Sequence, residues 1–179
     1  WNKYADFTDG TEIAAGNYTL KATYGNIETQ GFGAPYYEGV KEFSIKKNES
    51  TSISVICYLA NVKVTTEYTE LFKKYFTDYT VNIRPAGSTD ISFGKNETRA
   101  AYVKPGKISI YLSGSKQQGN KVTFEAATIE NAKARQHYRL KFDVQAGGTE
   151  LDVSFTDETE RVPITIDISD DALNTQPPF

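Results

Sequence analysis

Apolar side chains occupy every second position through much of this 179-residue chain. The pattern is clear in residues 18–24, where Tyr, Leu, Ala and Tyr alternate with polar residues, and it returns in residues 162–168. An alternation with period two places one set of side chains in a core and the other in water, as in strands of an antiparallel sheet. The sequence therefore predicts an all-β fold.

Turn-forming residues separate the apolar runs at intervals of ~8–12 residues, a spacing typical of β-sandwiches. One short helix is expected over residues 69–76, where Leu71, Phe72, Tyr75 and Phe76 share a helical face. A helix of about two turns is not stable alone, so it must pack on a sheet. Other strands are expected at residues 40–45, 51–59, 61–65, 79–84, 91–93, 99–103, 107–112, 121–126, 138–144 and 151–155.

The spacing of these strands favours two β-sandwich lobes. The first is expected over residues 1–60, and residue 1 can lie inside this lobe with earlier strands preceding it. The second is expected over residues 61–169. Residues 170–179 contain two consecutive prolines, which cannot continue a sheet, so they are expected to form a linker.

Composition narrows the classes of function. The 20 basic and 23 acidic residues leave a net charge of −3, which argues against a strongly basic nucleic-acid binder. No stretch approaches the ~20 apolar residues of a membrane-spanning helix. The chain has no Met, so we expect it to begin inside a longer polypeptide whose export signal has been removed.

No pattern of catalytic or metal-binding residues stands out. The single histidine, His137, has no partners for a triad or metal site, and we expect it to be solvated on the surface. The single cysteine, Cys57, alternates with Ile and Val and is expected to be a small buried residue. The acidic cluster of Asp157, Glu158 and Glu160 does not have the spacing of a calcium loop. We therefore expect no enzymatic activity, cofactor or metal.

Basic residues recur at every second position between 133 and 141. If a single strand extended through them, all would face one way along ~27 Å and could contact an anionic glycan or lipid headgroup. The alternative is an ordinary solvated face paired with acids such as Glu150 or Asp152, and we favour this alternative. The residues of this cationic stripe are Lys133, Arg135, His137, Arg139 and Lys141.

A glycine- and proline-containing loop carries Phe32, Tyr36 and Tyr37. Flat aromatic faces with hydroxyl tips suit sugars or protein partners, so these residues are a candidate binding patch. The alternative, which we favour, is that Phe32 and one tyrosine fold back and plug the end of the first sandwich.

Four segments, taken together, resemble one family. They are GNYTLKA at residues 16–22, PYYEG at 35–39, CYLANVKV at 57–64 and HYRLKFD at 137–143. The family is a domain of unknown function in surface lipoproteins of Bacteroides-type gut bacteria. Its layout is similar to that of the two-domain fimbrial anchor and fimbrillin-like proteins. The run over residues 15–24 also resembles a strand of transthyretin-like domains, so transthyretin-like or immunoglobulin-like lobes are expected.

The resemblance implies an exported protein at the outer membrane or cell surface of a Gram-negative bacterium. It implies a structural or adhesive module, with other surface proteins or glycans as partners and no nucleic acid. Membrane attachment would be only through a lipid anchor outside this chain. No catalytic residues carry over from the family. The alternative function is a glycan-binding module that uses the aromatic loop.

Overall fold

The computed structural model describes residues 14–47, 51, 53–117, 119–144 and 151–154. These residues are mostly β-strand with one short helix, which confirms the predicted all-β class. The strand expected at residues 162–168 and the linker expected at 170–179 lie outside the described residues. So do Glu150 and the acidic cluster at 157–160.

Contacts divide the chain into two compact units. The first comprises Trp1–Thr23 and Glu38–Tyr58, and the second comprises Tyr24–Tyr37 and Leu59–Phe179. The chain therefore passes between the units after residues 23, 37 and 58. The lobe boundary expected from the sequence, near residue 60, lies close to the last of these three passages. The hydrophobic pattern gives no sign of the two earlier ones, which send the Tyr24–Tyr37 loop into the second unit.

The first unit is built on a three-stranded sheet in the order β1-β3-β4. The strands are β1 (Gly16–Tyr24), β3 (Tyr37–Ile45) and β4 (Tyr58–Leu59). Across β1 and β3, the rings of Tyr18 and Phe43 stack with centroids 5.7 Å apart. Lys21 Nζ lies 3.1 Å from a carboxylate oxygen of Glu38. The strand predicted over residues 51–59 is reduced to its last two residues.

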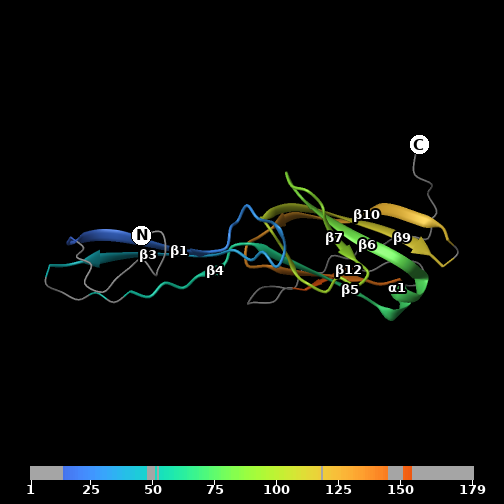
Figure 1. Cartoon of the computed structure of the whole chain (residues 1–179), viewed down its shortest axis with the longest axis horizontal. Coiled ribbons are helices and arrows are strands. Elements are labelled where there is room, and N and C mark those ends of the chain that lie inside the picture. Colours follow the sequence, from blue (N-terminus) through green and yellow to red (C-terminus); the bar gives the residue numbers. More distant parts are fainter. Residues whose placement is uncertain (1–13, 48–50, 52, 118, 145–150, 155–179) are drawn as a thin grey trace. The chain divides into compact units, whose positions relative to one another are not determined.

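The second unit contains two sheets, which Figure 1 shows as separate layers with the helix at one end. The antiparallel four-stranded sheet has the order β10-β9-β6-β7, with β6 (Phe76–Pro85), β7 (Ile91–Gly94), β9 (Gly106–Lys116) and β10 (Lys121–Ala132). The five-stranded sheet has the order β12-β11-β5-β8-β2, with β2 (Gly31–Phe32), β5 (Val62–Tyr68), β8 (Ala101–Val103), β11 (His137–Phe142) and β12 (Leu151–Ser154). Within the second sheet, β5 and β11 run parallel.

The core of the second unit lies between these sheets. Alternate residues along β5, β6, β9 and β11 are buried, among them Val64, Val81, Ile110 and Leu140. Their neighbours in sequence point outward, as the period-two pattern predicts. Apolar area removed from water in this layer stabilises the unit by about 25 cal/mol per Å².

The helix α1 (Glu70–Tyr75) closes one end of the core. Thr69 caps its N-terminus, because the Thr69 hydroxyl accepts a hydrogen bond from the Phe72 amide at 3.2 Å. Phe72 is fully buried and contacts the rings of Tyr68, Phe76, Tyr79 and Phe142. Burial in this cluster raises the pKa of Tyr68 to about 12. The helix is confirmed at its predicted position.

Candidate functional site

Cys57 is exposed, so the prediction of a buried thiol is wrong. Its sulfur lies 3.8 Å from the carbonyl oxygen of Ala22 in β1. Residues 53–57 alternate apolar and polar side chains but form no strand. The alternation predicts burial only where a second layer covers one face, and no layer of the described residues covers Cys57.

His137 is only 8% exposed, so the prediction of a solvated histidine is also wrong. It is the first residue of β11 and lies on the outer face of the five-stranded sheet, since Tyr138 faces the core. Its Nε2 lies 2.9 Å from the hydroxyl of Thr65 on the parallel neighbour β5. On the side of β5, Lys63 is in register with His137 and Thr65 follows on the same face, so these two side chains contribute to its burial.

The cationic stripe does not lie on one strand face. Because β11 begins at His137, Lys133 and Arg135 fall in the preceding turn, where Arg135 has a positive φ of 70°. Arg139 and Lys141 do lie on the outer face of β11. Lys141 is in register with Glu67 on one side and Asp152 on the other, as expected for an ordinary paired sheet face.

The aromatic loop is divided between two roles. Phe32 lies in β2 and packs edge-on against Phe93, with ring centroids 5.0 Å apart. The Arg99 guanidinium lies 4.9 Å from the centroid of the Phe32 ring. Phe32 therefore covers the core of the second unit, whereas the predicted plug was for the first lobe.

The two tyrosines of the loop differ from Phe32. Tyr36 is fixed through its backbone: its amide donates to the side-chain oxygen of Asn61, and its carbonyl accepts from the Ala60 amide at 2.8 Å. Tyr37 is 36% exposed, and its ring centroid lies 6.4 Å from that of Tyr24, which is 70% exposed. The exposed aromatic pair is therefore Tyr24 and Tyr37, and Tyr24 was not among the predicted site residues.

Beside this pair, four residues form one row across the five-stranded sheet. Gly31 of β2 is in register with Tyr102 of β8, Tyr102 with Lys63 of β5, and Lys63 with His137 of β11. The pairs share one face of the sheet, and the burial of Ala101 and Val103 shows that Tyr102 points outward. Burial, together with the nearby Tyr37 hydroxyl, raises the pKa of Tyr102. The backbone places Tyr37 at the same end of the sheet: the adjacent Tyr36 is hydrogen-bonded to Ala60 and Asn61, immediately before Val62, which is in register with Val103.

We name this surface the tyrosine–cation face and define it as Tyr24, Tyr37, Tyr102, Lys63 and Arg139. Arg139 lies two residues beyond His137, so it shares the outer face of β11 and is exposed. Among the residues whose side chains the structure describes, which excludes those of β12, neither Lys63 nor Arg139 makes an ion pair. Sequence reasoning missed Tyr102 and Lys63, because a parallel pairing of β5 with β11 leaves no local signal.

Comparison with protein families gives one result. The chain matches the domain of unknown function DUF4493 over residues 1–170. The chain belongs to the DUF4493 family. It matches no curated protein and no solved structure. The match confirms that the chain is a domain of unknown function.

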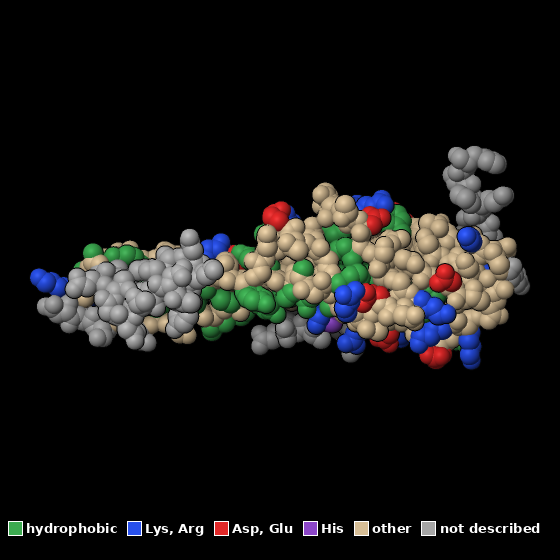
Figure 2. Space-filling view, viewed as in Figure 1, with side chains coloured by type: hydrophobic (Ala, Val, Ile, Leu, Met, Phe, Trp, Pro, Cys, Tyr) green, Lys and Arg blue, Asp and Glu red, His purple; other side chains and the backbone are tan. Residues whose placement is uncertain are grey.

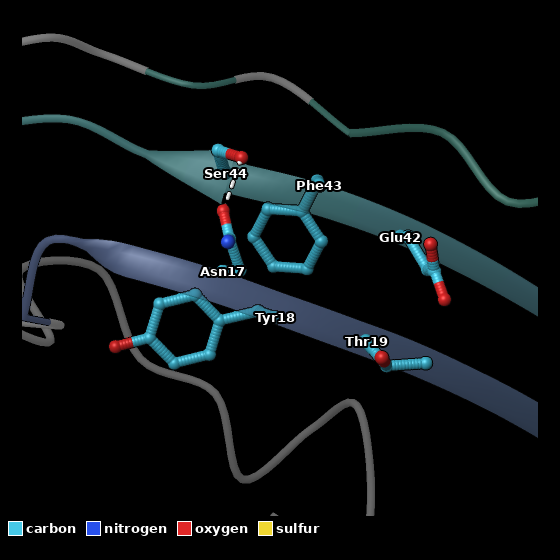
Figure 3. A pocket seen from close by; sticks show the side chains of 6 residues that line it. All are labelled: Asn17, Tyr18, Thr19, Glu42, Phe43 and Ser44. Atoms are coloured by element: carbon cyan, nitrogen blue, oxygen red, sulfur yellow. Dashed lines mark hydrogen bonds between the residues drawn. The ribbon is translucent and has the colours of Figure 1, made fainter.

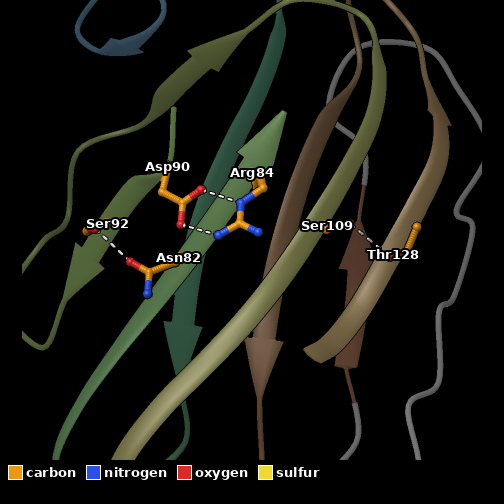
Figure 4. Close-up of polar contacts among 6 residues, drawn as sticks. All are labelled: Asn82, Arg84, Asp90, Ser92, Ser109 and Thr128. Carbon is orange, nitrogen blue, oxygen red and sulfur yellow. Dashed lines mark hydrogen bonds and ion pairs between the residues drawn. The ribbon is translucent and has the colours of Figure 1, made fainter. Parts of the chain in front are cut away.

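The outer face of the four-stranded sheet in this DUF4493 domain is occupied by pairwise polar contacts (Figure 4). Arg84 donates to both carboxylate oxygens of Asp90 at 2.6 and 2.9 Å, and Ser92 donates to the Asn82 side chain at 2.6 Å. Figure 2 shows basic and acidic side chains interspersed on the visible surface. These contacts tie neighbouring strands together and leave no concentrated charge there.

A shallow hollow lies over β1 and β3 (Figure 3). Its walls are residues 17–19 and 42–44, including the stacked rings of Tyr18 and Phe43. Ser44 donates to the Asn17 side chain at 2.7 Å across its end. Because Asn17 and Ser44 pair with each other and the Tyr18 hydroxyl donates to the Ala14 carbonyl at 2.8 Å, these three polar groups are already engaged within the unit.

Within the described ranges, no three His, Cys, Asp or Glu side chains are grouped as metal ligands would be. Across the same part of the chain, no helix has the length and apolar character needed to cross a membrane. The candidate site of this DUF4493 domain is therefore the tyrosine–cation face.

The contact beside Phe32 gives a prediction about pH. The carboxylate of Glu97 accepts hydrogen bonds from the side chain and from the backbone amide of Arg99. These bonds, with the side-chain bond as the larger cause, lower the pKa of Glu97 to about 2. A carboxyl whose folded pKa is depressed adds stability above its ordinary pKa near 4.5 and loses it as the pH falls towards 2. We expect an NMR titration of the Glu97 carboxyl to show a midpoint near 2, and Arg99→Gln to move it towards 4.5. A midpoint that Arg99→Gln leaves in place would contradict this contact.

Proposed function

We propose that this DUF4493 domain is a non-enzymatic structural or adhesive module of an exported protein at the cell surface of a Gram-negative bacterium. Attachment to the membrane would be through a lipid anchor outside this chain. The main support is the Tyr24–Tyr37 loop. In this loop the chain leaves the first unit, adds the short strand β2 to a sheet of the second unit, and then returns to the first.

Specific contacts hold this loop in the second unit. The Gln30 side chain donates to the Ser88 hydroxyl at 2.9 Å and accepts from the Lys104 amide at 2.9 Å. Phe32 covers the core, and Asn61 holds the Tyr36 amide. A force that pulls on residue 23 or residue 38 would therefore have to extract an embedded loop from the second unit, and such resistance suits a protein under tension.

The resemblance of residues 16–22, 35–39, 57–64 and 137–143 to surface lipoproteins also supports the proposal. The test uses the full-length protein in its native host. We expect antibodies against this domain to label intact cells, and a deletion strain to attach less well to surfaces or to other cells. Labelling only after permeabilisation would contradict the surface location. Unchanged attachment would contradict the structural or adhesive role.

The second candidate is a glycan-binding module, and the tyrosine–cation face is the observation that favours it. On a glycan array, we expect Tyr37→Ala to abolish or weaken specific signals. Tyr111→Ala is the matched control, because Tyr111 lies on the four-stranded sheet against Arg84. Equal loss for both variants would show that the tyrosine–cation face is not the glycan site.

A further inference from the structure

The tyrosine–cation face combines two kinds of chemistry within a short distance. Adjacent strands are about 4.8 Å apart and successive residues on one face about 6.7 Å apart. Tyr102 and Lys63 are on adjacent strands, and Arg139 is one strand further and two residues along. The aromatic end and the far cation are therefore separated by ~12 Å, a span that an extended oligomer can cover.

The aromatic end is accessible from solvent. Tyr24 and Tyr37 are exposed, and Tyr102 is in register with Gly31. A Cβ placed on Gly31 would meet no atom within 4 Å, so the space at Gly31 is open. Tyrosine offers an apolar ring face with a polar hydroxyl at its tip, which suits the mixed apolar and hydroxyl surface of a sugar ring.

Among the strands of this sheet whose side chains are described, β2, β5, β8 and β11, the acidic residue is Glu67 of β5, and it makes no ion pair with Lys63 or Arg139. Glu67 is in register with Lys141, whereas Lys63 and Arg139 are in register with His137 and Thr65. Lys63 and Arg139 have no ion-pair partner among the residues whose side chains the structure describes. Two such cations on a sheet face attract a ligand that carries negative charge.

We propose that the tyrosine–cation face binds an anionic glycan, with tyrosine rings against the sugars and Lys63 and Arg139 against their acidic groups. The inference rests on the glycan-binding candidate function. The headgroup of phosphatidylglycerol shares the charge but is acyclic and offers no ring for Tyr24 and Tyr37 to stack on, so the glycan fits more of the face.

The probes are polygalacturonate as a carboxylated glycan, chondroitin sulfate as a sulfated one, and dextran as a neutral one. Isothermal titration of the whole chain should show binding to at least one anionic glycan and weaker binding to dextran. Because exposed charges are screened by salt, the affinity should fall between about 0.05 and 0.5 M salt. The anionic probe that binds identifies the acidic group.

Variants locate the site. We expect Lys63→Gln and Arg139→Gln each to weaken anionic binding by about two- to five-fold, and Tyr37→Ala to weaken it by about five-fold or more. Lys121→Gln is the matched control, because it removes the same charge from the four-stranded sheet. Unchanged melting temperatures show that the variants remain folded. If the folded variants of the tyrosine–cation face lose affinity and Lys121→Gln does not, the proposal is supported.

Other outcomes overturn it in distinguishable ways. Equal binding of dextran and the anionic glycans would leave the glycan-binding function standing and reject the anionic class. Anionic binding that Lys121→Gln weakens as much as Lys63→Gln would place the site elsewhere. Binding to none of the three probes would reject the inference. If a wider glycan array were also blank, the candidate function would fail with it. Binding to phosphatidylglycerol vesicles but to no glycan would show a lipid-binding face instead.

Discussion

Replacing Phe72 with alanine should lower the free energy of unfolding of the second unit by ~3–5 kcal/mol. Phe72 is 0% exposed and its ring contacts four others, Tyr68, Phe76, Tyr79 and Phe142. Alanine would remove the buried ring and leave a cavity that β-strands on two sheets cannot readily fill. Since small domains are stable by only ~5–15 kcal/mol, this loss would be visible in urea unfolding followed by circular dichroism.

The neighbouring residue provides a matched control. Leu71 precedes Phe72 in α1, but its side chain is 59% exposed. We expect Leu71→Ala to change the free energy of unfolding by less than ~1 kcal/mol, since surface substitutions have small effects. Similar losses for the two variants would show that the helix does not pack on the sheets as described.

Replacing Gly25 with alanine should destabilise the chain by ~2–5 kcal/mol. Gly25 has a φ of +84°, and a left-handed conformation costs an alanine about 1–2 kcal/mol. A Cβ there would also lie 2.3 Å from the carbonyl oxygen of Pro35, and relieving such overpacking costs ~1–3 kcal/mol more. The measurement is the free energy of unfolding, together with hydrogen exchange at the Tyr36 amide, which should become faster.

A substitution at Gly33, in the same loop, distinguishes the conformational cost from the cost of overpacking. Gly33 has a φ of +66°, but a Cβ there would meet nothing within 4 Å. We therefore expect Gly33→Ala to lose only the conformational ~1–2 kcal/mol. If Gly25→Ala were no worse than Gly33→Ala, the close approach of Gly25 to Pro35 would be contradicted.

Hydrophobic periodicity predicted most of the second unit correctly. The helix at 69–76 and the strands around residues 80, 110 and 140 lie where the pattern places them, because burial of alternate residues is a local property. The pattern failed for Cys57, whose segment has the alternation but no covering layer. It also failed for His137, where accessibility depends on the side chains that β5 places beside it.

The candidate face could be predicted only in part. Tyr37 and Arg139 were found as members of an aromatic loop and a basic run. Their neighbours Tyr102 and Lys63 come from β8 and β5, strands distant in sequence from both. A register between strands far apart in the chain is set by packing in three dimensions, so no local pattern could have joined these four residues.

The Tyr24–Tyr37 loop also limits how a gene for this domain can be recombined. A crossover near residue 60 would bring in a new partner for residues 61–179 but would discard β2, which lies at the edge of their sheet beside β8. The recombined chain would lack the packing of Phe32 against Phe93, and the edge of β8 would be unpaired. Unpaired edges invite aggregation. Exchange of either unit therefore needs breakpoints at three positions at once, and the two units should be inherited together.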